Sequence, residues 1–390
     1  MKKVFLGFGL LVVVNMINAQ KKVDKKNKVI EFPMNEKHWA AVTDNVEFLN
    51  YKSLPAVRST NENGFGIMLK DFEFTDGIIE FDVEFKGSGF PGIDFRIDKD
   101  TLNSEKFYMR YFGTPDDLRR TTLQYAAVLD GVNMWDVTDE YQAAATIYEA
   151  KWNHVKLVIN GKQMKVYVND TQQVALHVPA LEGITKSGGI SLTGNVVYAN
   201  FIVRPNETED LASNEGYDST YSDSRYLRNW SVTQPVDFPF GKDVMKNSQR
   251  GPIGIDPVLF DSTAVWKPLK VERRGLVNIT RLYGATERGE RRITWIKTTI
   301  SSETPQKKRV DMGFSDEVWV FINGGLLHTD KNYYGTPGMK EPRGRCTIEN
   351  TSFELPLQKG ENEILIGVTN YFFGWGIIAR LENTDGLKFE

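Results

Sequence analysis

The chain has 390 residues, and its 48 Lys and Arg against 51 Asp and Glu give a formal net charge of −3. This near-neutral balance argues against general nucleic-acid binding, which needs a strongly basic surface. The single cysteine, Cys346, excludes an intrachain disulfide, so stability must come from apolar cores, and the length suffices for two domains.

The N-terminus has the features of an export signal. Lys2 and Lys3 precede an apolar run, residues 4–14, that is too short to span a bilayer, and Ala19 offers a small residue for cleavage. We therefore expect residues 1–19 to be a signal peptide and the mature protein to be secreted, into the periplasm or outside the cell. A retained membrane anchor is the alternative, and no other run is long and apolar enough to span a membrane.

Residues 74–85 contain the clearest strand pattern of the first half of the chain. Strict alternation of apolar and acidic side chains predicts a strand with one buried face and one open face. Residues 93–97 and 107–111 repeat the pattern, so three strands should place polar side chains on one sheet face. In the first strand the apolar residues are Ile79, Phe81, Val83 and Phe85, and the acidic ones are Glu80, Asp82 and Glu84.

Short alternating segments and tight turns continue through both halves. Asn160-Gly161 predicts a hairpin between residues 152–159 and 165–169, and no long stretch has helical spacing. Further strands are expected at 275–282, 291–300, 317–323, 352–357 and 362–370. The predicted fold class is all-β, with two antiparallel β-sandwich (jelly-roll) domains joined by an acidic linker.

The linker is predicted at residues 205–224, where every charged residue is acidic. A calcium-binding loop is the alternative reading of this segment, but the carboxylate spacing fits no EF-hand pattern. The expected domains are therefore 29–204 and 225–390.

Two sets of segments resemble known domains. Residues 76–83, 107–112 and 152–161 resemble the concanavalin A-like or laminin G-like jelly roll, and 318–324, 357–370 and 374–376 resemble the galactose-binding-like β-sandwich. The combination resembles secreted bacterial polysaccharide-associated proteins. The resemblance implies a carbohydrate-binding protein whose partner is a polysaccharide or oligosaccharide, with no cofactor beyond an optional structural calcium ion.

Glu80-Phe-Asp-Val-Glu84 resembles the Glu-x-Asp-x-Glu strand of bacterial β-glucanases. That resemblance implies Glu80 as nucleophile, Asp82 as an orienting carboxylate and Glu84 as acid/base. A retaining glycosidase needs its two carboxyl groups ~5–5.5 Å apart, whereas i and i+4 on a flat strand are ~13 Å apart. We therefore expect a noncatalytic strand. A glycoside hydrolase, β-glucanase-like or keto-disaccharide hydrolase-like, remains one alternative, and a structural or adhesion protein is the other.

Ligand-binding candidates combine Arg, which offers a planar donor fork, with aromatic platforms and amides. The alternatives are cross-strand ion pairs, Asp94–Arg110 or Glu84–Arg96, and a core position for Trp375. The four histidines lack metal-ligand spacing, so no metal site is expected. The candidates are Asp94, Arg96, Tyr108, Arg110, Gln124, Tyr125, Asn133 and Trp135 in the first domain, and Asp330, Tyr333, Tyr334, Arg343, Arg345, Phe372 and Trp375 in the second.

Overall fold

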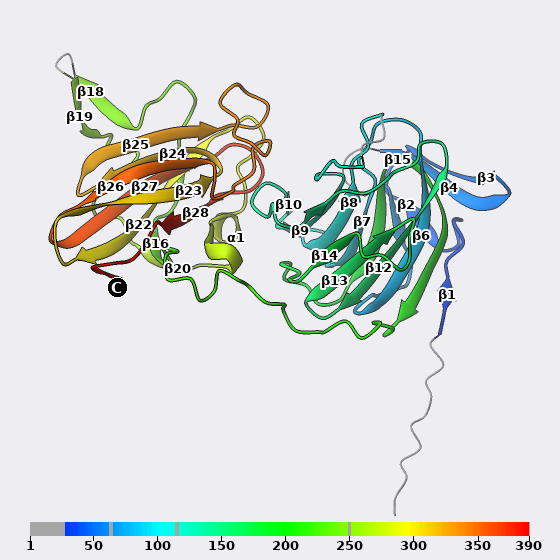
Figure 1. Cartoon of the computed structure of the whole chain (residues 1–390). Coiled ribbons are helices and arrows are strands. Elements are labelled where there is room, and N and C mark those ends of the chain that lie inside the picture. Colours follow the sequence, from blue (N-terminus) through cyan, green and yellow to red (C-terminus); the bar gives the residue numbers. More distant parts are fainter. Residues whose placement is uncertain (1–27, 62–64, 114–116, 249–250, 390) are drawn as a thin grey trace, which may run out of the picture.

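The computed structural model describes residues 28–61, 65–113, 117–248 and 251–389, and the predicted signal peptide lies outside them. The described chain is almost entirely β, and its strands pair antiparallel, as predicted. It has one short α-helix, α1 (Thr280–Tyr283), and one 3-10 turn, η1 (Arg273–Gly275). Neither helix in this part of the chain has the length and apolarity to cross a membrane. Figure 1 shows two β-sandwiches, which we call the N-terminal sandwich (β1 to β15) and the C-terminal sandwich (β16 to β29).

The N-terminal sandwich has two layers that share one long strand, β15 (Gly189–Pro205). Residues 189–193 of β15 pair with β7 in the first layer, and residues 196–205 pair with β6 in the second. The first layer contains β2 (Trp39–Ala41), β5 (Ile67–Leu69), β7 (Gly92–Ile97), β8 (Ser104–Met109), β9 (Leu123–Leu129), β10 (Val132–Asn133) and β11 (Gln142–Ala143). The second contains β1 (Ile30–Glu31), β3 (Val46–Tyr51), β4 (Leu54–Asn61), β6 (Gly77–Phe85), β12 (Trp152–Asn160), β13 (Gln163–Val168) and β14 (Leu176–Val178).

Gly194 marks the place where β15 passes between the layers. Its φ is +113°, and a Cβ there would lie 2.4 Å from the Cα of Pro91, so only glycine fits. The core between the layers contains the predicted apolar phase of β6, because Ile79, Phe81, Val83 and Phe85 are fully buried.

The C-terminal sandwich packs one sheet of eight strands against another of four. The larger sheet is ordered β20-β16-β22-β27-β24-β25, with β17 and β29 also paired to β22, and the smaller is ordered β21-β28-β23-β26. The larger contains β16 (Asn229–Val232), β17 (Val236–Asp237), β20 (Lys267–Lys270), β22 (Arg292–Ser302), β24 (Asp316–Ile322), β25 (Gly325–Asn332), β27 (Gly360–Asn370) and β29 (Leu387–Phe389). The smaller contains β21 (Leu276–Asn278), β23 (Gln306–Phe314), β26 (Thr351–Leu357) and β28 (Gly376–Leu381), and β18 (Met245–Ser248) and β19 (Gly251–Ile255) form a separate hairpin.

The two sandwiches are in direct contact along β9 and β10. Figure 1 shows these strands on the side of the N-terminal sandwich that faces the C-terminal one. A buried apolar cluster joins the two, so the contact resembles a small core. Its members are Ala127, Leu129, Val132, Met134 and Val137 from the first sandwich and Leu276, Cys346 and Ile378 from the second.

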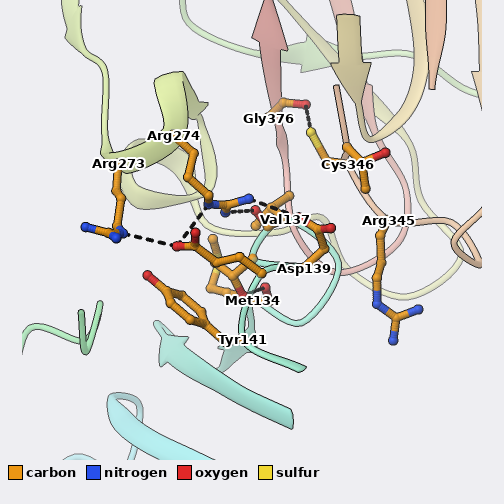
Figure 2. A network of polar contacts seen from close by, with 12 residues as sticks. Met134, Val137, Asp139, Tyr141, Arg273, Arg274, Arg345, Cys346 and Gly376 are labelled. Atoms are coloured by element: carbon orange, nitrogen blue, oxygen red, sulfur yellow. Dashed lines mark hydrogen bonds and ion pairs between the residues drawn. The ribbon is translucent and has the colours of Figure 1, made fainter. Parts of the chain in front are cut away.

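A polar network borders this apolar cluster (Figure 2). Arg274 donates to the Asp139 carboxylate at 3.0 Å and to the Val137 carbonyl oxygen at 2.9 Å. Arg273 donates to the Glu140 carboxylate at 3.2 Å. Both arginines are mostly buried, so these ion pairs hold the sandwiches in one orientation more firmly than exposed pairs would.

The predicted linker follows the surface of the N-terminal sandwich. Leu211 is buried against Ile78, Val158 and Tyr167, and Lys156 forms an ion pair with Glu209. The segment therefore packs on the N-terminal sandwich, in addition to connecting the two.

Candidate functional site

A cavity of about 540 Å³ lies between the sandwiches and combines aromatic with cationic side chains. Strands β7 to β10 and the adjoining turns supply one wall, and residues 334–345 and 372–373 supply the other. Members of both predicted residue sets therefore meet in one cavity, although no sequence pattern indicated that the two sets are neighbours. The predicted residues that line it are Asp94, Tyr108, Arg110, Asn133, Trp135, Tyr334, Arg343, Arg345 and Phe372.

An aromatic wall surrounds Trp135. Its ring centroid lies 5.3 Å from that of Tyr334, 5.9 Å from Phe373 and 6.4 Å from Phe372, each with edge-to-face geometry. Tyr334 and Phe372 stack in parallel at 5.3 Å. Tyr334 is 46% exposed and Phe373 is 39% exposed, so apolar ring surface remains open to a ligand.

Two buried aspartates hold the loop that carries Phe372 and Phe373. Asp316 accepts the N–H groups of Tyr371 and Phe372, at 2.6 and 3.2 Å. Asp136, from the other sandwich, accepts the Gly374 N–H with both oxygens at 3.0 Å. Burial raises the pKa of Asp316 well above its usual value and raises that of Asp136 to about 7.

Arg110 is 9% exposed and lies beside the aromatic wall. Its guanidinium donates to the Tyr108 hydroxyl and the Thr121 carbonyl oxygen, both at 2.8 Å, and to the side-chain oxygen of Gln124. The Gln124 amide donates to the Trp135 carbonyl oxygen at 2.8 Å, which fixes its orientation and turns its oxygen toward Arg110.

Arg345 enters the cavity from the C-terminal sandwich and is 2% exposed. Its guanidinium lies 4.8 Å from the Trp135 ring centroid and donates to Gln124 at 3.4 Å and to the Pro342 carbonyl oxygen at 3.2 Å. Burial, with the positive charge of Arg110 nearby, lowers the pKa of Arg345 to about 10. Figure 2 shows its side chain turned away from the Arg274–Asp139 pair.

The ion pairs Asp94–Arg110 and Glu84–Arg96, which were the alternative to a binding role, do not form. Asp94 instead pairs with Lys106 at 2.6 Å, because these residues face each other in the β7–β8 register. The alternation also predicted that this polar sheet face is open to solvent. That prediction is wrong at Asp94, which is 1% exposed.

Arg96 does not reach the cavity. It occupies a β-bulge between β7 and β15 with φ of +54°, which redirects its side chain. Its guanidinium donates to Asp76 at 2.8 Å and to the Thr75 and Gly161 carbonyl oxygens, both at 2.9 Å. Arg96 therefore has a structural role, and its prediction as a ligand-binding residue is wrong.

Five other predicted residues do not line the cavity. Gln124 is fully buried and contacts the lining residues Arg110 and Arg345. Tyr125 belongs to the inward phase of β9 and donates from the core to Glu105 at 2.6 Å, and Trp375 is fully buried in the C-terminal core. Asp330 pairs with Lys340 at 2.8 Å. The Tyr333 hydroxyl donates to Glu317 at 2.8 Å, away from the cavity.

The carboxylates of β6 are each held by polar partners. Glu84 is fully buried and accepts from Lys52, Lys86 and Tyr51 at 2.5, 2.7 and 2.7 Å. A pair of catalytic carboxylates on β6 would require a bulge in β6 itself. The register shift between β6 and β15 lies instead on β15, between Ala199 and Ile202.

Glu80 and Asp82 share a histidine. His154 contacts Asp82 at 2.8 Å and Glu80 at 3.5 Å, and Glu80 also pairs with Arg204. Hydrogen bonding to Asp82, and then to Glu80, raises the pKa of His154 to about 9. This arrangement is an ion-pair network, and it leaves no open carboxylate pair of the kind that a glycosidase uses.

Within the described ranges, no group of three or more His, Cys, Asp or Glu side chains is arranged to hold a metal ion. The structural calcium ion that the resemblance adds stays a prediction.

A larger hollow of about 1340 Å³ also borders both sandwiches. Two of its guanidinium groups already have carboxylate partners, since Arg273 pairs with Glu140 and Arg281 with Glu272. We therefore regard the smaller cavity, with its open aromatic rings, as the candidate site.

Four aromatic residues that line the cavity, Phe65, Phe90, Phe112 and Phe373, were not predicted from the sequence. Phe90 and Phe112 form an edge-to-face pair with centroids 5.8 Å apart, and both are more than a third exposed. Phe373 completes the wall around Trp135. Phe112 and Phe373 directly precede glycines, and Phe90 precedes Pro91-Gly92. An aromatic residue in a turn is the one sequence signal that could have identified them.

No protein-family model matches the chain, and no curated protein matches it. Among solved structures, it is similar to the carbohydrate binding module CBM66 from Bacillus subtilis, at 17% identity over 42% of this chain and 91% of that one, with a TM-score of 0.31. It is also similar to a Bacillus licheniformis β-glucanase, at 10% identity over 47% and 100% of the two chains, with a TM-score of 0.32. A Bacillus subtilis protein with a galectin-like fold reaches 0.34, at 11% identity over 45% and 94%. Likenesses this distant carry no argument about function, which depends on the geometry above.

Proposed function

We propose that the protein binds a carbohydrate, a polysaccharide or an oligosaccharide, in the cavity between its two sandwiches. The observation that carries this proposal is the exposed rings of Tyr334 and Phe373, packed around the buried Trp135, beside buried hydrogen-bond donors. Sugar rings present apolar C–H faces that pack on aromatic rings, and their hydroxyl groups pair with guanidinium and amide groups. The cavity's volume also falls within the usual range for small-ligand sites.

Both sandwiches contribute to this single site. Trp135 and Arg110 come from the N-terminal sandwich, whereas Tyr334 and Arg345 come from the C-terminal one. The apolar cluster and the Arg274–Asp139 pair fix the relative position of the two walls before a ligand arrives. Such preorganisation lowers the entropic cost of binding. In this proposal the mature, secreted chain binds as one unit, and a separated sandwich would have only half of the site.

Affinity gel electrophoresis and calorimetry of the mature chain with a panel of glycans test the proposal. Tyr334→Ala should lower the affinity for the best glycan by about 10-fold or more, the usual cost of losing a stacking platform. Tyr148→Ala is the matched control, since Tyr148 is 45% exposed against 46% for Tyr334 and lies outside the cavity. Failure of every glycan to bind, or an equal loss in both variants, contradicts the proposal.

The same mixtures test the hydrolase alternative. New reducing ends that disappear in Glu80→Gln or Glu84→Gln would establish cleavage by the β6 carboxylates. We expect none, because His154, Arg204 and the Glu84 donors already occupy these groups.

A further inference from the structure

Among the described residues, the buried guanidinium groups of Arg110 and Arg345 donate only to neutral acceptors. Arg110 donates to a hydroxyl, a carbonyl and an amide oxygen, and Arg345 donates to a carbonyl oxygen and the same amide oxygen of Gln124. In the part of the chain that the structure describes, neither forms an ion pair with an Asp or Glu. Two positive charges thus share one neutral oxygen inside the protein.

This arrangement is costly without a further partner. A buried charge is stabilised chiefly by an opposite charge and by complete hydrogen bonding. The side chain of Arg345 is 2% exposed. Its Nε is buried and has no acceptor among the described residues. The lowered pKa of Arg345 reflects the same burial together with repulsion from Arg110.

The nearby carboxylates do not pair with either arginine. Asp136 and Asp139 favour the charge of Arg345 through space, but each nearby carboxylate has other partners, and Asp139 pairs with Arg274. Asp94 accepts from Lys106 and Ser104, at 2.6 and 2.9 Å. Both oxygens of Asp136 accept the Gly374 N–H. The cavity lining as a whole is cationic, with Lys106, Arg110, Arg343 and Arg345 against Asp94 alone.

We propose that the cavity selects an acidic saccharide, whose carboxylate or sulfate group takes the place of the missing counter-charge at Arg110 and Arg345 while its ring packs on the wall around Trp135. This inference rests on the proposed function and narrows it to one ligand class. A planar guanidinium fork pairs well with either anion, and the shared oxygen of Gln124 places the two arginines within reach of one group.

Matched ligands separate charge from shape. The probes are tetragalacturonate with its methyl ester, tetraglucuronate with its methyl ester, and a sulfated galactan oligosaccharide with its desulfated form. Calorimetry should give at least one acidic member that binds about 10-fold or more tightly than its neutral counterpart. The affinity for the acidic member should fall as salt is raised, and the affinity for the neutral one should not. The salt series needs no variant, so it is independent of any folding defect.

Variants locate the effect in the cavity. Arg345→Gln and Arg110→Gln should each lower the affinity for the preferred acid by about 10- to 100-fold, and should lower the affinity for the neutral counterpart by a clearly smaller factor. Arg343→Gln, at the exposed rim, should give a smaller loss without risk to folding. Arg58→Gln is the charge-matched control and should have no effect, since Arg58 lies on β4, outside the cavity, and pairs with Glu47 on β3.

The outcomes distinguish the two proposals. A preference for the acid that Arg345→Gln or Arg343→Gln removes supports both. Equal binding of acid and neutral forms, with Tyr334→Ala abolishing both, overturns the acidic preference and leaves carbohydrate binding intact. Failure of all six probes and of the wider glycan panel overturns both proposals.

Discussion

The carboxylate of Asp136 accepts the backbone N–H of Gly374 with both oxygens at 3.0 Å, across 238 positions of sequence. This contact joins the N-terminal sandwich to the loop that presents Phe372 and Phe373. A Cβ at position 374 would lie 2.5 Å from an Asp136 oxygen, so a glycine is required for this close approach. The aromatic wall of the candidate site therefore depends on one buried acid from the opposite sandwich.

We predict that Asp136→Asn changes how stability responds to pH. Burial raises the pKa of Asp136 from 3.8 to about 7, so its contribution is complete below the unfolded value and is lost as pH rises through about 7. Asparagine keeps an acceptor for Gly374 and cannot ionise. Urea unfolding at about pH 5 and about pH 8 measures the free energy of unfolding of both proteins. The free energy of the variant relative to that of the wild type should be higher at about pH 8 than at about pH 5. An identical difference at both pH values would contradict this prediction.

His154 should give a second pH dependence, at higher pH. Its pKa is raised from 6.5 to about 9 by Asp82 and Glu80, so the stabilisation is present below 6.5 and is lost as pH rises through about 9. The ring is 37% exposed, so solvent screening limits the effect to about 1 kcal/mol or less. Above neutral pH, the melting temperature of His154→Gln should fall less steeply with rising pH than that of the wild type. Parallel curves for the two proteins would argue against the network.

Glu84→Gln should destabilise the N-terminal sandwich by about 1–3 kcal/mol, because three donors lose a buried ionised acceptor. Burial raises the pKa of this carboxyl, but hydrogen bonds from Lys52, Lys86 and Tyr51 lower it overall, so the charge persists at neutral pH. Glu47→Gln, which breaks the exposed pair with Arg58, is the control and should cost under about 1 kcal/mol. Equal urea midpoints for the two variants would show that Glu84 has no structural role.

Two buried tryptophans form a matched pair for a test of hydrogen bonding. Trp295 donates its Nε1–H to the Leu259 carbonyl oxygen at 2.7 Å, whereas the Nε1 of Trp375 has no partner among the described residues. Both rings are nearly or fully buried. Trp295→Phe should therefore lower the free energy of unfolding by about 1 kcal/mol more than Trp375→Phe, since only the first substitution leaves an acceptor unpaired. Chemical denaturation measures both, and a larger loss for Trp375→Phe would contradict the assignment.

Most strands were predictable because alternation is a local property. The predicted strand 152–159 is β12 (Trp152–Asn160), and 317–323 is β24 (Asp316–Ile322). The segment 275–282 was only partly right, since β21 ends at Asn278 and α1 begins at Thr280. A helix of one turn is too short to show helical spacing.

Candidate binding residues were less predictable. Tyr108, Arg110 and Trp135 line one cavity, but each is less than a tenth exposed because residues of the C-terminal sandwich cover them, and their role in binding stays a prediction. Tyr125 and Arg96 do not line the cavity, since a phase assignment fails where a polar side chain enters the core or a bulge shifts the register. Nothing in the spacing along the chain could reveal either event.

Local pattern along the chain was enough to specify the β class, the buried phase of β6 and the turn at Asn160-Gly161, because backbone geometry converts short-range pattern directly into strands. Folding in three dimensions was needed to cover the polar face of β8 and β9 and to bring Arg345 to Gln124, 221 positions away. Docking of two preformed surfaces depends on their complementary shape and charge, and these are properties of residues that are neighbours only after folding.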